Sequence, residues 1–486
     1  MMNGNQNGGG GPSQSDQMFA GNHSIGEKSM ELFREIAQVE SLGCGTKIGM
    51  YGGGKQQLTP VITYQEGAML RDIDGNEYLD IGGSMAAGNL GMRPQPVLDA
   101  MFEQSKTVAF APDYPTIPRV ELAKKLVSIA PGTMKNNSKV MFDVGGGPMC
   151  DLAAKLAYYH NISIKKRTRN AVMTFYGCYH GRSIFTSMLT GYSNFVDNIP
   201  AGQEVIKVPY PHCYHCYFDK EYPSCGMFCT KYIRKMFELS HTGWRNDATD
   251  NTMVSTIFVE PYQCHGGGIQ PPPEFYPELR KICDDFGVLM IEDNIPTFTY
   301  SGHWFGSEHY GVTPDMEVLG KGLTAGMWPL GAVIAKKELY EGWDDEPDRH
   351  YCSYIGHPLG CAAALETIHQ IEQNDLLENA RKLGKQMTEG LREIEKRHPS
   401  VGEVTEFGII HGMEFVRSKE QRTPGVEISQ AVVREALKRG LVLLGGLGSF
   451  GNRHIIHPAL NTTPQQIDRC LELMDESITA VEKMGL

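Results

Sequence analysis

The chain has no long apolar run and no excess of positive charge, and each absence excludes a class of protein. No stretch approaches the roughly 20 apolar residues that a membrane-spanning helix needs. The first residues lack a charged segment followed by an apolar one, so we expect no secretory signal. The formal net charge of -12 argues against binding to a nucleic-acid backbone, because proteins that do so present a basic surface. These features predict a cytoplasmic enzyme.

Length and periodicity predict two domains of the α/β class. The 486 residues exceed what one ordinary core holds. From about residue 96, short apolar runs such as KVMFDV, STIFVEP and VLMIED alternate with helical patterns, which is typical of a mostly parallel sheet covered by helices. We therefore predict a large domain at 96–345, and a smaller α+β domain formed by residues 26–95 together with 346–486.

Three local patterns lie outside this large domain. Residues 1–25 are rich in Gly, Asn, Gln and Ser and have no apolar pattern, which predicts a disordered tail. The stretch 61–81 alternates apolar and polar residues around Asp74-Gly75, which predicts a β-hairpin. Thr463 precedes an amphipathic segment, and we expect it to cap the last helix.

Three patterns in the large domain carry residues suited to chemistry. In FDVGGGPM, residues 145–147 are glycines that follow a strand and open a helix, where backbone N–H groups bind phosphate; a turn that only packs is the alternative. In VLMIEDNIP, Asp293 ends a buried strand and needs a partner, either a protonated pyridine nitrogen or the next turn. In EVLGKGL, Lys321 lies in an apolar, glycine-flanked turn, where desolvation would lower its pKa and make the amine nucleophilic.

Taken in order, several segments resemble the motifs of the class III aminotransferases, which use pyridoxal 5'-phosphate (PLP). These segments are FDVGGG, FYGCYHGR, FVEPYQ, VLMIEDNIP, GVTPDMEVLGKGL and SYIGHPLGCAAAL. The resemblance runs from about residue 60 to the C-terminus and is most specific over 254–335. It implies the PLP-dependent transferase fold of type I, in a homodimer whose active sites lie at the subunit interface. It also implies amino-group transfer between an amine or amino acid and a keto acid or aldehyde.

The same resemblance assigns roles to the residues already singled out. Lys321 matches the lysine that holds PLP as a Schiff base, and Asp293 matches the carboxylate beneath the pyridine nitrogen. Gly146 and Gly147 fall where backbone N–H groups bind the cofactor phosphate.

Three further positions follow from the resemblance alone. Tyr179 matches the aromatic residue that stacks on the pyridine ring, and Glu260 matches the first acidic residue after the preceding strand. Ser353 stands where the family has a phosphate-binding threonine that is donated by the other subunit. We expect no metal among the site residues.

The chain departs from the family pattern at two loops of the cofactor site. Residues 145–149 read GGGPM in place of Ser-Gly-Thr-Glu-Ala, so two hydroxyl donors are lost while the backbone donors remain. After Asp293, residues 294–296 read NIP in place of Glu-Val-Gln, so the glutamine that contacts the ring hydroxyl is missing.

A second, linked departure concerns the substrate. Ile455 aligns with the arginine that binds the α-carboxylate of glutamate in many members, and His265 stands where those members have a glutamate that neutralises this arginine. Losing both is coherent, because an unpaired buried charge costs several kcal/mol. We therefore expect poor use of glutamate. Arg453 and His454 are neighbouring substitutes, neither of which we favour.

A cysteine-rich insert, VPYPHCYHCYFDKEYPSCGMFCTKYI, is the last unusual feature. Cys213, Cys216, Cys225 and Cys229 form a CxxC and a CxxxC pair, a spacing compatible with zinc. Similar inserts occur in class III members that racemise or epimerise amino acids, and we favour plain structural thiols over a metal. A PLP-dependent racemase or epimerase on the same site is the alternative function. A non-catalytic PLP-fold binding protein is disfavoured by the retention of Lys321 and Asp293.

Overall fold

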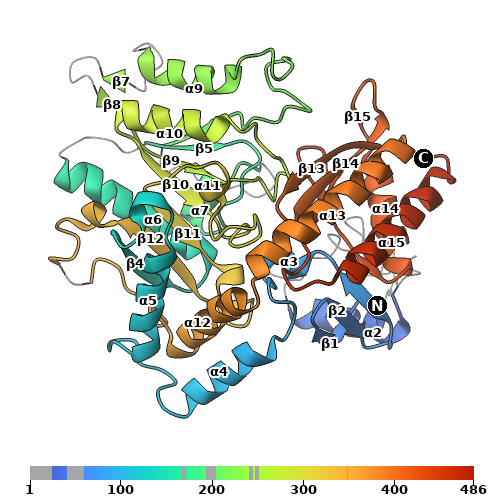
Figure 1. Ribbon diagram of the computed structural model, residues 1–486, viewed down its shortest axis with the longest axis horizontal. Helices are drawn as coiled ribbons and strands as arrows, with labels where there is room; N and C mark the ends of the chain where they lie inside the picture. The colour runs from blue at the N-terminus through green and yellow to red at the C-terminus, as the bar shows by residue number, and fades with distance from the viewer. Residues whose placement is uncertain are drawn as a thin grey trace, which may run out of the picture.

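The structure, a computed structural model, describes residues 25–40, 60–165, 171–192, 204–239, 245–246, 251–346 and 348–486. A group of elements around one large sheet lies beside a second group around two smaller sheets (Figure 1). The predicted tail lies outside the described residues up to position 24.

The large sheet has seven strands and is mostly parallel. Its order is β4-β12-β11-β10-β9-β5-β6, and only β12 runs antiparallel to its neighbours. The strands are short apolar runs buried on both faces, as expected for a parallel sheet between helices. Their bounds are β4 (Ser138–Asp143), β5 (Ala171–Phe175), β6 (Val205–Val208), β9 (Val254–Val259), β10 (Leu289–Asp293), β11 (Met316–Leu319) and β12 (Gly331–Lys336).

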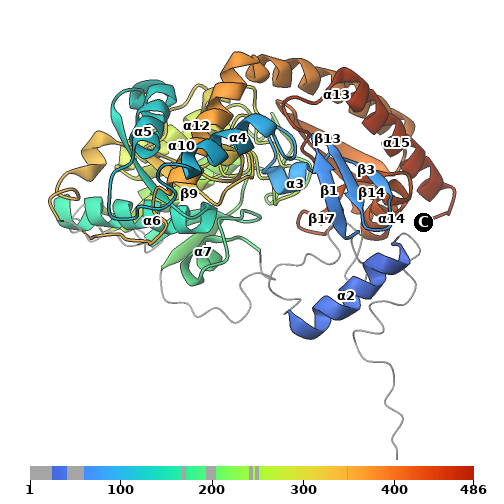
Figure 2. The same ribbon diagram turned by 90° about the horizontal axis from the view of Figure 1, so that it is seen from below.

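Helices cover both faces of this sheet. One face packs against α6 (Gly146–Tyr159), whose buried Met149, Leu152 and Leu156 join one apolar cluster with strand residues. The opposite face packs against α5 (Ile117–Ile129), α10 (Phe275–Phe286) and α12 (Pro358–Gln373), as the view from below shows (Figure 2). The sheet therefore places the carboxyl ends of β10 and β11 and the start of α6 at one edge.

The smaller sheets combine the two ends of the chain. A four-stranded sheet has the order β1-β2-β3-β16, so a C-terminal strand pairs in parallel with an N-terminal one. The other has the order β13-β14-β18-β17, with β15 on β14. The strands are β1 (Ile62–Glu66), β2 (Met69–Asp72), β3 (Glu77–Asp80), β13 (Val401–Phe407), β14 (Ile410–Ser418), β15 (Thr423–Pro424), β16 (Leu441–Val442), β17 (Leu444–Leu447) and β18 (Arg453–Ile456).

The remaining elements complete the two groups. Helices α13 (Leu376–Arg397), α14 (Val426–Lys438) and α15 (Pro464–Glu482) accompany the five-stranded sheet (Figure 1). The others are α2 (Glu27–Val39), α3 (Gly83–Ala86), α4 (Gln95–Ser105), α7 (Ile184–Leu189), α9 (Phe228–Glu238), α11 (Gly306–His309), β7 (Arg245–Asn246), β8 (Asn251–Thr252), η1 (Gly132–Met134), η2 (His160–Ile164), η4 (Lys321–Thr324) and η5 (Lys337–Tyr340).

Several local predictions are confirmed. β2 and β3 form the hairpin around Asp74-Gly75. Thr463 caps α15, and its hydroxyl accepts a hydrogen bond from the backbone N–H of Gln466. The domain boundaries near 95 and 345 stay predictions. None of the helices in the described part of the chain is long and apolar enough to cross a membrane.

Candidate active site

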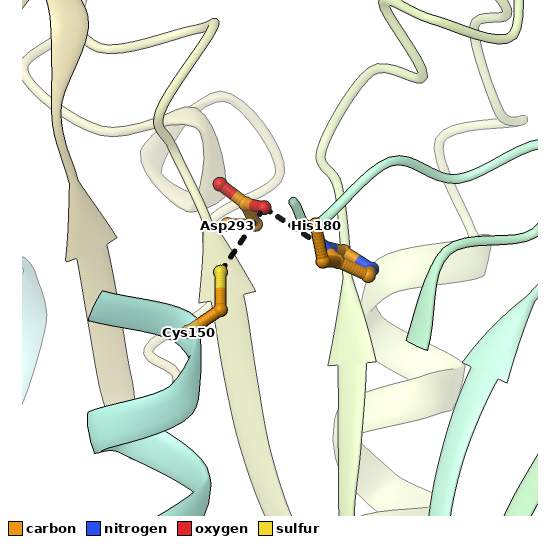
Figure 3. A group of neighbouring side chains, drawn as sticks. All are labelled: Cys150, His180 and Asp293. Carbon is orange, nitrogen blue, oxygen red and sulfur yellow. Dashed lines mark hydrogen bonds and ion pairs between the residues drawn. The ribbon is translucent and has the colours of Figure 1, made fainter. Parts of the chain in front are cut away.

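A buried carboxylate at the end of β10 forms the centre of the site (Figure 3). Asp293 Oδ2 lies 2.7 Å from His180 Nδ1 and 3.7 Å from Cys150 Sγ, and its Oδ1 accepts a hydrogen bond of 3.0 Å from the backbone N–H of Ile295. The three side chains come from the strand end, the loop after β5 and the first turns of α6. Because a carboxylate has about four lone-pair positions, these contacts leave room for one more N–H donor.

The neighbours of His180 favour its protonated form. Burial lowers the pKa of His180, but the charge of Cys178 and the hydrogen bond to Asp293 raise it well above its ordinary value. The Nε2 atom of His180 is buried and has no hydrogen-bond partner. The ligand atoms of Cys150, His180 and Asp293 lie within 4.8 Å of one another, so a metal ion is geometrically possible there. Such an ion would have to replace the 2.7 Å imidazole–carboxylate hydrogen bond.

Lys321 follows β11 directly and lies near several acidic groups. It is the first residue of η4, with φ of 42°, a left-handed conformation that is uncommon for a lysine. Its side chain is partly buried, and burial lowers the pKa of its amine although the charges of Cys264, Asp293 and Glu260 oppose this. A lysine with a lowered pKa is more often neutral and can act as a nucleophile or a base.

The glycine turn before α6 lies against the lysine turn. Gly145 has φ of 94°, a conformation that favours glycine. A Cβ added to Gly146 would approach Ile295 Cδ1 to 2.6 Å, so the two residues are closely packed. A Cβ added to Gly320 would lie 3.4 Å from the Gly146 nitrogen. The start of α6 presents unpaired N–H groups and the positive end of its dipole, which together favour an anion such as a phosphate.

Glu260 and Tyr179 are linked beside this centre. Glu260 Oε2 accepts a hydrogen bond of 3.3 Å from the backbone N–H of Tyr179, and burial raises the pKa of Glu260 well above its ordinary value although the charge of His180 opposes this. The ring of Tyr179 stacks on His265, with centroids 4.3 Å apart and planes 20° from parallel. One face of Tyr179 is therefore already covered by the residue that replaces the family's glutamate.

Ser353 lies at the surface, unlike the buried Asp293 and Glu260. It is exposed, in the segment that precedes α12. Its neighbours anchor this segment, since Tyr351 donates a hydrogen bond of 3.1 Å to Asp113 and the ring of Tyr354 lies 5.7 Å from that of Phe110. An exposed position is what a contact with a second subunit needs, and that contact stays a prediction.

Three residues near Lys321 were missed by sequence reasoning. Burial and the charge of Lys321 lower the pKa of His457 to about 3, and its Nε2 has no partner. Asn89 donates a hydrogen bond of 2.9 Å to the Gly322 carbonyl, whereas its own side-chain oxygen is unpartnered. Cys264 is buried, and burial raises the pKa of its thiol well above the ordinary value although the charge of Lys321 opposes this. The His457-Pro458 pair in GNRHIIHPAL is the sequence signal for this histidine. The same segment shows that position 455 lacks an arginine.

Arg453 and His454, which lie next to the position that lacks an arginine, are both bonded to other residues and are not free to bind a substrate carboxylate. Arg453 Nη1 lies 2.8 Å from Glu403 Oε2 and also bonds Glu414, while its Nε donates to the Gly267 carbonyl at 2.8 Å. The two acidic residues and Arg453 are direct neighbours across β13, β14 and β18. His454 points to the other side of β18 and contacts Ser429, with 3.0 Å between Nε2 and Oγ.

Comparisons with known proteins agree with this geometry. The model of the family described as "Aminotransferase class-III" matches residues 50–478. Leucine/methionine racemase of Thermococcus litoralis is 30% identical, over 87% of this chain and 92% of its own. Adenosylmethionine-8-amino-7-oxononanoate aminotransferase of Nitratidesulfovibrio vulgaris is also 30% identical, over 87% and 78%. The crystal structure of a PLP-bound amine transaminase from an uncultivated Pseudomonas species superposes with a TM-score of 0.78 at 27% identity, covering 87% of this chain and 94% of that one.

Proposed function

Because this chain belongs to the class III aminotransferases, we propose that Lys321 is the residue that binds PLP covalently and then moves the proton during catalysis. The chain has the type I fold of PLP-dependent transferases and is a PLP-dependent enzyme that moves an amino group between an amine or amino acid and a keto acid or aldehyde. One observation supports the assignment of Lys321 most strongly. Ile295, whose N–H binds Asp293, packs on Gly146, and Gly146 lies against Gly320, the residue before Lys321.

The residues of this edge fit the parts of PLP. The N–H groups of Gly146 and Gly147 would hold its phosphate, and Asp293 would accept a hydrogen bond from its pyridine nitrogen. When bound, PLP supplies an electron sink for the negative charge that develops at the substrate Cα. His180 holds Asp293 in position through the 2.7 Å hydrogen bond between them. We propose that Tyr179 packs on the pyridine ring. Burial raises the pKa of Glu260 and so favours its uncharged form, and Glu260 positions the backbone of Tyr179.

Lys321 would handle the proton at the substrate Cα. Its lowered pKa leaves more of the amine neutral near neutral pH, so that Nζ would accept this proton and hold it until it is returned. The nearby carboxylate of Asp293 favours the resulting ammonium.

We propose a homodimer in which Ser353 binds the phosphate of the other subunit's PLP. Large apolar side chains are exposed on and between α4 and α5, among them Ile117 at 81%, Tyr114 at 71% and Phe102 at 63%. Phe110, in the same stretch, packs on Tyr354, which follows Ser353. A surface of this kind is unusual on a monomer and is typical of an interface. The described cysteines are all free, which supports a cytoplasmic location.

The lysine assignment is tested by reduction with borohydride. Treatment of the holoenzyme should bleach its visible absorption and fix PLP to a single peptide that contains Lys321. Lys321→Ala should take up no label, whereas the exposed Lys337→Ala serves as a matched control and should be labelled as wild type is. A label on any other lysine, or none, would contradict the assignment.

A racemase or epimerase is the second candidate. Racemases and an epimerase are among the relatives at about this level of identity, and the arginine that would bind the α-carboxylate of glutamate is absent. The same proton transfer at Lys321 serves both reactions, since they differ in the atom that receives the proton. Incubation with a panel of amines and amino acids, with and without pyruvate or 2-oxoglutarate, separates them. Loss of amine only with a keto acid indicates transamination, and inversion without one indicates racemisation.

A further inference from the structure

The four cysteines of the insert meet in one place, away from the cofactor site. Cys213, Cys216, Cys225 and Cys229 are all partly buried and free, and all line a single cavity of about 30 Å³ between β6 and α9. A cavity of this size holds one or two water molecules or one ion. Its other walls are mostly aromatic and apolar. Apolar side chains could fill so small a cavity, so packing alone does not explain why four free thiols line it.

The backbone brings the two cysteine pairs together in different ways. Cys213 and Cys216 share one turn of the loop after β6. Cys225 and Cys229 flank a sharp bend, in which Gly226 and Met227 both have left-handed φ, of 54° and 56°, and α9 begins directly after it. The spacing C-x2-C and C-x3-C therefore places two thiols on each of two facing segments, which is the usual layout of a four-cysteine zinc site.

The cavity also has one cationic wall residue. Lys220 lines it and lies 4.8 Å from the Phe228 ring. A divalent cation bound among the four sulfur atoms would deprotonate the thiols and hold the resulting thiolates together.

We propose that Cys213, Cys216, Cys225 and Cys229 bind one structural zinc ion. Zinc takes four thiolates in a tetrahedron at about 2.3 Å, and a closed set of four protein ligands is typical of a structural site. No three of these four sulfur atoms lie within 4.8 Å of one another. Binding therefore requires the four sulfur atoms to move closer together than they stand in this structure.

The zinc ion would fix the insert to the five-stranded sheet, which contains Glu414. The residues next to the first cysteine pair, His212 and His215, reach the buried carboxylate of Glu414, with 2.6 Å between His215 Nε2 and Glu414 Oε1. The zinc site thus sets the position of two histidines that complete the surroundings of Arg453.

The test is the metal content of the full-length holoenzyme. Protein purified without chelators should contain about one zinc per chain that survives dialysis. Replacement by Co²⁺ should give the thiolate-to-metal absorption and visible bands of tetrahedral cobalt in a Co²⁺-minus-Zn²⁺ difference spectrum, in which the absorption of PLP cancels. Cys213→Ser and Cys229→Ser, one from each pair, should weaken zinc binding at least about tenfold. Cys470→Ala, which removes a buried cysteine far from the insert, should not.

The wild-type measurements decide the matter if a variant fails to fold. Four thiols should be protected from a thiol reagent in the native protein and should become reactive when zinc is removed by a chelator. Wild type without zinc, together with a difference spectrum that lacks the thiolate band, would overturn the proposal. So would disulfides between these cysteines in freshly purified, reduced protein, or iron and sulfide in place of zinc.

Discussion

Restoring an arginine at position 455 should destabilise the protein unless a carboxylate is restored with it. Ile455 is 2% exposed in β18 and pairs with Gly412 on one side and Leu444 on the other. Arg453 lies two residues away and therefore on the same face of the strand. It already uses both nearby carboxylates, those of Glu403 and Glu414. A second guanidinium there would be buried without an anion.

The expected cost follows from that missing anion. An uncompensated buried charge costs about 3–5 kcal/mol. Ile455→Met is the matched control, because a long uncharged side chain of similar volume should cost less than about 1.5 kcal/mol. His265→Glu would supply a carboxylate from the loop whose Gly268 lies against Gly412, the pairing partner of Ile455. We expect the double variant to recover about 0.5–3 kcal/mol of coupling.

Urea unfolding of the four variants measures these differences, and half-reactions with glutamate measure the function. Ile455→Arg alone should not improve glutamate use, whereas the double variant should improve it. If Ile455→Arg is as stable as Ile455→Met, the reasoning about buried charge is wrong. If wild type uses glutamate and 2-oxoglutarate as well as any other pair, the interpretation of both positions is wrong.

Three further outcomes are expected. Asp293→Asn should fold normally and lose most turnover, because an amide cannot keep the pyridine nitrogen protonated; a Cα-deuterated substrate should show an undiminished isotope effect, and near-normal turnover would remove Asp293 from this role. Burial raises the pKa of Glu414, but the hydrogen bond from His215 and the charge of Arg453 lower it from 4.5 to about 2. The ionised Glu414 should therefore contribute about 3 kcal/mol to the free energy of unfolding above pH 4.5. This contribution should be lost as the pH falls toward 2. Urea unfolding against pH should therefore be flatter in this range for Glu414→Gln, and an unchanged slope would contradict the assignment. Sedimentation should show a dimer, Ser353→Ala should bind PLP more weakly, and a monomer with full PLP would contradict the shared site.

The sequence predicted best what is local and periodic. Buried strands such as β9 and β10 are short, mostly apolar runs, so their positions and the parallel sheet follow from pattern alone. The glycines at 145–147 and Lys321 were found because strand ends and glycine turns have local signals.

The contacts between distant segments could not be predicted in this way. The pairing of Asp293 with His180 joins residues 113 positions apart, and neither residue's neighbours in sequence encode it. The stacking of Tyr179 on His265 depends on two loops meeting above the sheet. The sequence shows Arg453 only as a cation close to position 455. Its two carboxylate partners lie on other strands, so these ion pairs could not be predicted from neighbouring residues.

The bonds of Arg453 also limit how the enzyme can admit its substrate. They join the Gly267 and Gly268 carbonyls, in the loop that follows β9 of the large sheet, to carboxylates on β13 and β14 of the small one. A hinge rotation of one sheet against the other would leave the ion pairs intact, because Arg453, Glu403 and Glu414 share the five-stranded sheet. It would break the buried hydrogen bonds from the Arg453 guanidinium to the Gly267 and Gly268 carbonyls, at a cost of about 1.5–3 kcal/mol each. Rigid-body closure over microseconds to milliseconds is therefore disfavoured. Access is left to faster movements of side chains and loops around Tyr179 and His265, so the angle between the two sheets should be the same with and without substrate.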